Sequence, residues 1–171
     1  MHKYLTYLLI LIISMNGYTD FKNLGPNDIL TTPLPLPYNE KVVKTSELDS
    51  FIDTSIQKGK QPVIIFGGNW CPDCRILDGT LDIPTIKKFM QQHYQIMHID
   101  IGRYDKNMEL MDHLDIESKK GVPRVVILDL EKNILNTAAS SEWTTARDRK
   151  QQEIYDYFQR FVVINLSLIH I

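Results

Sequence analysis

The feature that most constrains this chain is its pair of cysteines, Cys71 and Cys74, which are the only two in the sequence. They are spaced Cys-x-x-Cys, directly after the apolar run Val63–Phe66 and a pair of glycines, and a stretch that can be helical follows them. A strand, a short glycine loop and two cysteines on the first turn of a helix form the arrangement of a dithiol redox site. The pattern therefore indicates thiol–disulfide chemistry.

Two other interpretations of the cysteine pair are a structural disulfide and half of a metal site. A structural zinc site needs about four ligands, and the sequence has no second Cys-x-x-Cys motif. His93, His98 and His113 are scattered along the chain without ligand spacing. We therefore expect no metal and favour a catalytic dithiol that works without a cofactor other than its own redox-active disulfide.

Composition narrows the class of protein. The 171 residues are 43% hydrophobic and 23% charged, which is ordinary for a globular domain with its own core. The formal net charge is -2, and no long basic stripe occurs, so the sequence argues against nucleic-acid binding.

The two ends of the chain differ from its middle. A basic start, His2 and Lys3, precedes an apolar stretch at 4–13 that is shorter than a bilayer span. This pattern predicts a secretory signal peptide over residues 1–19, and hence a periplasmic or cell-envelope protein. The alternatives are an uncleaved N-terminal anchor and a buried first helix.

A linker or surface arm is expected over residues 20–39, because four prolines there favour extended backbone. The globular domain is expected over 40–163. The final residues, Leu166–Ile171, are what a common transposon-type sequencing adaptor encodes, so residues 164–171 carry no functional argument.

Apolar periodicity within the domain predicts helices alternating with strands. We expect one helix from Thr45 with Ser46 as its cap, one from Cys71 to about Asp78, and one opened by Asp82 and Pro84. A short helix around 108–114 and a last helix from about 145, with an apolar stripe at 154–162, follow them. Strands are expected at 63–66, 94–101 and 124–129, with an edge strand at 134–135. The order predicts an α/β fold with a mixed sheet and helices on both faces.

Two motifs carry a resemblance to a known family. The turn Trp70-Cys71-Pro72-Asp73-Cys74 follows a buried strand, and Gly121-Val122-Pro123 precedes another. With both motifs, the chain resembles thioredoxin-fold proteins over roughly residues 40–163. The first motif is identical to that of cytosolic thioredoxin-related proteins, whereas the segment after it is more similar to modules of bacterial envelope reductant-relay proteins. The resemblance implies a thioredoxin fold, with a central mixed β-sheet flanked by helices.

The chemistry expected at the motif follows from its place at a helix start. Free N–H groups and the positive end of the helix dipole stabilise a Cys71 thiolate, so we expect this sulfur to be the nucleophile. Cys74 lies one turn further and is the expected resolving thiol. We expect Asp73 to raise the pKa of Cys71 and Arg75 to offset it, which gives a moderately reducing dithiol.

The resemblance also implies a surface for substrates. It makes Pro123 a cis proline opposite the cysteines, with the Val122 backbone free to pair with an extended substrate segment. Trp70 and Pro72 complete the expected substrate-binding set, whereas Arg124 is expected at the rim.

Two positions depart from the family pattern. Thioredoxins carry a buried acid in the strand before the motif and a lysine on the next central strand, and these positions match Ile65 and Met97 here. The proton acceptor for Cys74 is therefore not supplied in the usual way.

The sequence thus predicts a monomeric thiol–disulfide oxidoreductase that acts on protein disulfides in the cell envelope, as a reductant or isomerase, and exchanges electrons with a redox partner. The rival hypothesis is a non-catalytic binding module, which would hold a peptide or a metal-delivery partner in the groove between Trp70 and Pro123.

Overall fold

A computed structural model describes residues 21–163, so the predicted signal peptide and the tail at 164–171 lie outside the described residues. Its sheet has three strands: β1 Gln61–Gly67, β2 Tyr94–Asp100 and β3 Arg124–Ile127. The strand order is β2-β1-β3, with β1 parallel to β2 and antiparallel to β3. The predicted mixed sheet is confirmed.

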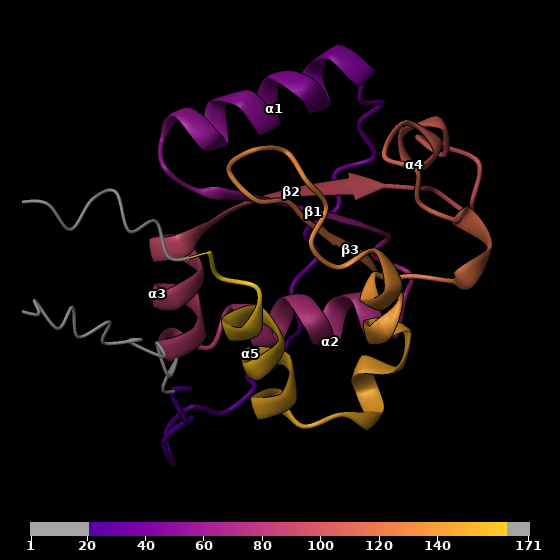
Figure 1. The fold of residues 1–171 in the computed structure, drawn as a ribbon. Coiled ribbons are helices and arrows are strands. Elements are labelled where there is room, and N and C mark those ends of the chain that lie inside the picture. Colours follow the sequence, from indigo (N-terminus) through magenta and orange to yellow (C-terminus); the bar gives the residue numbers. More distant parts are fainter. Residues whose placement is uncertain (1–20, 164–171) are drawn as a thin grey trace, which may run out of the picture.

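Helices cover both faces of this sheet (Figure 1). On one side lie α1 Thr45–Gln57 and the short α4 Glu109–His113, and on the other lie α2 Pro72–Leu81, α3 Pro84–His93 and α5 Gln151–Arg160. Each side has its own apolar core. The described residues also form three short 3-10 helices: η1 Ser118–Lys120, η2 Thr137–Ala139 and η3 Glu142–Asp148.

The central strand β1 explains why the sheet needs two helical layers. All seven of its residues are buried. Ile64 and Phe66 contribute to the core under α1, whereas Val63 and Ile65 contribute to the core formed with α2 and α5. A strand buried on both faces must read as a continuous apolar run, which is the pattern seen in the sequence.

The predicted helix caps are wrong at two places. The residue at the N-cap of α1 is Lys44, not Ser46, and the Lys44 side chain makes no capping hydrogen bond. Asp82 does not open α3, because its N–H still bonds to Asp78 O at 3.1 Å and it therefore ends α2. As a result, α2 extends past the predicted end at Asp78.

The C-terminal part also differs from the prediction. The expected edge strand is reduced to a single bridge between Leu128 and Ile134. The last helix begins at Gln151 instead of about 145, because the preceding residues form η3, which buries Trp143 and Ala146. The apolar stripe of the last helix is buried as predicted up to the helix end.

Two side chains lie deeper than the sequence suggested. Tyr38, assigned to the surface arm, is only 4% exposed and belongs to the core under α1. Arg124, expected at the rim, is buried, and its guanidinium donates to Glu117 O and to Ser140 Oγ. Over residues 21–163, no helix has both the length and the apolar character needed to cross a membrane.

Candidate functional site

The site is built on the N-terminus of α2. Cys71 is the N-cap residue, with extended backbone (φ -89°, ψ 115°), and Pro72 is the first helical residue. The sulfur of Cys71 accepts a hydrogen bond from the backbone N–H of Cys74 at 3.2 Å. A cysteine thus takes the capping role that a serine or aspartate oxygen usually has, and Pro72 has no N–H to leave unpaired there.

The two sulfurs have opposite acidities. Both cysteines are free and buried, with 4% of Cys71 and 1% of Cys74 exposed. A hydrogen bond from the Cys74 side chain, opposed by burial and helped by the Cys74 backbone N–H, lowers the pKa of Cys71 to about 7. The hydrogen bond to Cys71 and burial raise the pKa of Cys74. Cys71 is therefore the thiol that ionises near neutral pH, as the nucleophile must.

The aspartate inside the motif has a partner that the sequence did not reveal. Asp73 is buried, and its Oδ1 accepts from the backbone N–H of Arg147 at 2.9 Å and from the Arg147 Nε at 3.0 Å. The guanidinium also contacts Asp73 Oδ2 through Nη2. The carboxylate still acts to raise the pKa of Cys71, as predicted. The arginine that pairs with this carboxylate is Arg147 on η3.

Arg75 instead holds the N-terminal arm. Its guanidinium donates to Leu34 O at 3.1 Å and to Pro35 O at 3.3 Å. The arm packs closely against the same helix, since a Cβ on Gly79 would lie 2.9 Å from Leu30 Cδ1. The predicted pKa-tuning role of Arg75 therefore receives no support from its contacts.

The predicted Val122–Pro123 segment lies against the cysteines. Its peptide bond is cis, and the Cys71 thiol donates to Val122 O at 3.6 Å. Both residues are buried, whereas Pro72 is exposed on the outer surface of the turn. The structure thus brings Val122 and Pro123 together with the dithiol.

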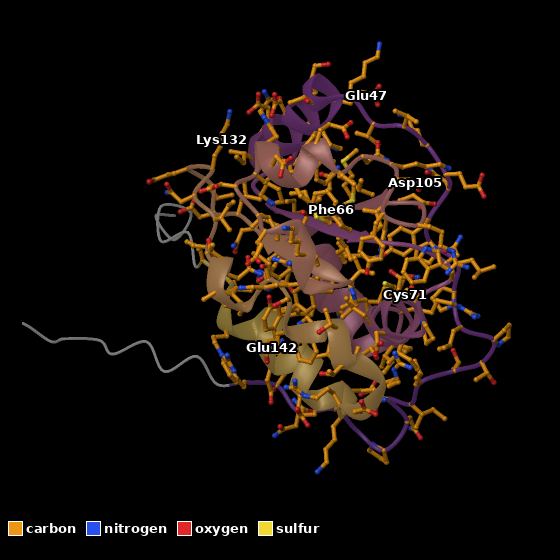
Figure 2. All side chains as sticks on the ribbon, turned by 90° about the vertical axis from the view of Figure 1, so that its right-hand side faces the viewer. Glu47, Phe66, Cys71, Asp105, Lys132 and Glu142 are labelled. Carbon is orange, nitrogen blue, oxygen red and sulfur yellow. The ribbon has the colours of Figure 1, made fainter. Side chains whose placement is uncertain are left out.

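Trp70 forms the outer rim of the site and is 36% exposed. Its indole N–H donates to Gly102 O, and the Arg103 guanidinium lies 4.7 Å from the ring centroid. Tyr104 packs beside the same ring with the centroids 5.8 Å apart. In Figure 2, Cys71 and Asp105 lie on the same side of the molecule, while Phe66 lies towards its middle. The β2–α4 loop therefore provides one wall next to the cysteines.

Three residues of the site escaped prediction: Tyr38, Asn69 and Arg147. Tyr38 N–H donates to Asn69 Oδ1 at 3.1 Å, and Asn69 Nδ2 donates to Tyr38 O at 2.7 Å. Asn69 stands inside the motif segment and could have been flagged by that position. Tyr38 and Arg147 lie 33 residues before and 76 residues after Cys71, and no local pattern singles them out.

The departures at Ile65 and Met97 hold in the structure. Ile65 is buried in the core formed with α2 and α5, whereas Met97 packs against the core under α1. Neither offers a proton acceptor to Cys74. Within the part of the chain that the structure describes, no three His, Cys, Asp or Glu side chains are grouped as a metal site would require.

Comparisons with known proteins agree with this geometry. A family model described as Thioredoxin matches residues 38–159. The disulphide isomerase from Xylella fastidiosa Temecula1 is similar in structure, with a TM-score of 0.67 and 30% sequence identity over 74% of this chain and 97% of that chain. The germline-specific thioredoxin Deadhead from Drosophila melanogaster shares the fold, with a TM-score of 0.50 and 17% identity over 72% of this chain and 100% of that chain. No curated protein matches the sequence.

The matched region contains the whole sheet, the Cys-x-x-Cys turn and the Val122–Pro123 segment. The fold is that of thioredoxin, as the motifs implied, and the chain belongs to the thioredoxin family.

Proposed function

We propose that the protein is an exported thiol–disulfide oxidoreductase that reduces or isomerises disulfides of proteins in the cell envelope. The observation that carries the proposal is the Cys71 sulfur at the N-terminus of α2, with its pKa lowered to about 7 and Cys74 hydrogen-bonded to it. A thiolate at neutral pH with a second thiol in contact is what exchange requires. The similarity to a protein named as a disulphide isomerase supports the same chemistry.

The reaction needs only the two sulfurs. The Cys71 thiolate attacks a substrate disulfide, a new bond forms between Cys71 and one substrate sulfur, and the other substrate sulfur leaves as a thiolate. Cys74 then attacks Cys71, which closes the Cys71–Cys74 disulfide and releases the second substrate sulfur. Two electrons have passed from the dithiol to the substrate, and a partner dithiol returns them. In isomerisation, a different substrate thiolate attacks the substrate sulfur of the mixed disulfide instead, which forms a new substrate disulfide and releases Cys71 as a thiolate, so the dithiol is recovered.

The substrate would lie between Trp70 and the Val122–Pro123 segment. An extended peptide there can pair with the Val122 backbone as an added strand, which places its disulfide against Cys71. Export is proposed from the basic and apolar leader in the sequence, and fractionation of cells that express the full chain tests it.

Substitution and trapping test the function. Cys71→Ser is expected to lower disulfide reductase activity with insulin by about a thousandfold or more, because no nucleophile remains. Cys74→Ala, which keeps the nucleophile, is expected to accumulate covalent mixed disulfides with envelope proteins. Full activity of Cys71→Ser would refute the mechanism. If Cys74→Ala trapped nothing, the non-catalytic binding module would be the better interpretation.

The reduction potential of the Cys71–Cys74 couple decides the direction of electron flow. Equilibration with dithiothreitol followed by alkylation is expected to give a value near that of thioredoxin, about -270 mV. A value near about -120 mV would make the protein a disulfide donor instead. A pair that could be reduced only in the unfolded protein would be a structural bridge.

A further inference from the structure

Because the usual acid and lysine are replaced, the resolving thiol lacks the groups that normally assist its deprotonation. Cys74 must lose its proton before it attacks the mixed disulfide, because the thiolate is the attacking species. Yet Cys74 is only 1% exposed, and the matching family positions, Ile65 and Met97, carry no ionisable group. Some other group near the sulfur has to stabilise the anion.

The Tyr38 hydroxyl lies beside that sulfur. A Cβ placed on Gly67 would lie 2.8 Å from Cys74 Sγ and closer still to the Tyr38 oxygen, so the two atoms converge on the same point above Gly67. This convergence also explains the glycine at the end of β1, since no larger residue leaves room for both groups.

The hydroxyl has no competing partner. Tyr38 is 4% exposed, and among residues 21–163 its oxygen has no hydrogen-bond partner in this conformation. Burying a hydroxyl without a hydrogen-bond partner costs free energy, and the Cys74 sulfur is the nearby atom that can accept a hydrogen bond from Tyr38. A phenol O–H is a better donor than a thiol S–H, and the acceptor gains most when the sulfur is ionised.

The motif itself fixes the tyrosine in place. Asn69 hydrogen-bonds to both the N–H and the carbonyl of Tyr38, and Arg75 hydrogen-bonds to the preceding arm residues Leu34 and Pro35. Two side chains that flank the cysteines in sequence therefore hold the arm that delivers the hydroxyl. This arrangement ties Tyr38 to the dithiol.

We propose that the Tyr38 hydroxyl donates a hydrogen bond to the Cys74 sulfur and stabilises the thiolate that resolves the mixed disulfide. This inference rests on the proposed function. In the resolving step, the Cys74 sulfur bonds to Cys71, the bond from Cys71 to the substrate breaks, and the proton given up by Cys74 ends on the departing substrate sulfur. Tyr38 keeps its own proton, because burial raises its pKa well above the ordinary value.

The titratable groups near this pair include Cys71, Asp78, His98 and Tyr104. The His98 imidazole packs edge-on against the Tyr38 ring, with centroids 5.4 Å apart, and its Nε2 lies 2.7 Å from Asp78 Oδ1. The negative charges of Asp78 and Cys71 both act to keep the tyrosine protonated. The surroundings thus favour a neutral donor over a base.

Tyr38→Phe in the full chain is the direct test, since it removes one oxygen and keeps the ring. The reduced protein is mixed with insulin, quenched with acid at intervals, and the mixed disulfide is followed by mass spectrometry. We expect the mixed disulfide to decay about tenfold more slowly than in the wild type, while alkylation of Cys71 changes less than about twofold.

Tyr155→Phe is the matched control. Tyr155 is also buried, and its hydroxyl has no hydrogen-bond partner within residues 21–163, but it lies in the other core. It is expected to resolve mixed disulfides at the wild-type rate. Equal decay in Tyr38→Phe and the wild type would overturn the inference, and so would equal slowing in both variants, which would show a general effect of losing a buried hydroxyl.

A second measurement separates this inference from the proposed function. In the Cys71→Ser variant Cys74 is the only thiol, and its alkylation by iodoacetamide can be followed against pH. Adding Tyr38→Phe is expected to move the midpoint up by about one pH unit, whereas an unchanged midpoint would refute the role of Tyr38. A wild-type protein without exchange activity would refute the proposed function, while this titration would still test the hydrogen bond.

Discussion

Two segments from opposite ends of the domain hold the start of α2, and they do so through different kinds of interaction. The N-terminal arm binds through backbone hydrogen bonds to Asn69 and Arg75 and through the buried ring of Tyr38. The later segment, η3, binds through the charge pair between Asp73 and Arg147. The arm brings the uncharged Tyr38 hydroxyl close to Cys74. The contact with η3 places the charges of Asp73 and Arg147 close to Cys71.

The difference shows how two sulfurs in contact can be controlled separately. A charge acts over distance and shifts the pKa of the more accessible thiol, Cys71, whereas a hydroxyl acts only on the atom it touches. The carboxylate of Asp73 is 3% exposed and the Arg147 side chain 53% exposed, so the pair sits at the border of solvent and its effect depends on both partners. Perturbing the arm should therefore change resolution and stability, and perturbing η3 should change the reactivity of Cys71.

Breaking the arm's anchor is expected to have the largest effect. Asn69→Ala removes two hydrogen bonds and leaves the backbone groups of Tyr38 unpaired, so the free energy of unfolding in urea should fall by about 1–3 kcal/mol. The alkylation midpoint of Cys71 should remain near that of the wild type.

Asn133→Ala provides the comparison for that variant. The Asn133 side chain donates a hydrogen bond to Asp129 on the exposed surface, and its loss should cost less than about 1 kcal/mol. If both asparagine variants unfolded at the same urea concentration, the arm would not be anchored as described.

The pH dependence of the alkylation rate of Cys71 tests how the start of α2 controls this thiol. Because the thiolate is the reactive form and the pKa of Cys71 is about 7, alkylation should be close to its plateau above pH 8. Below pH 6, the rate should fall about tenfold for each pH unit as the sulfur becomes protonated. A midpoint near the ordinary thiol value of about 8.5 would show that the helix start does not stabilise the anion.

Removing the compensating charge should give the smallest effect. In Arg147→Ala the carboxylate of Asp73 loses its cation, so the pKa of Cys71 should rise and its alkylation rate at pH 7 should fall about two- to threefold. Lys87→Ala breaks an exposed ion pair with Asp82 far from the cysteines and should leave that rate unchanged. A faster reaction in Arg147→Ala would contradict the assigned direction.

Most of the fold could be predicted because its signals are local. The apolar run of β1, the stripe of α5 and the Cys-Pro-x-Cys helix start each depend on neighbouring residues. The errors fell at helix ends and at the edge strand. Asp82 stays on α2 through its backbone hydrogen bond to Asp78 O, and η3 replaces the first turns expected for the last helix.

The sequence by itself determined the family, the dithiol and which sulfur is at the helix start. The dithiol and the helix start follow from strand, turn and helix signals within a few residues of Cys71, and the family follows from these together with the second motif at Gly121-Val122-Pro123. Only the tertiary structure decided what surrounds the sulfurs. Arg147 meets Asp73 across 74 residues, and Tyr38 meets Asn69 across 31. Such contacts are selected by how whole helices and segments pack, and no spacing in the chain records which distant side chain will fill the place next to a sulfur.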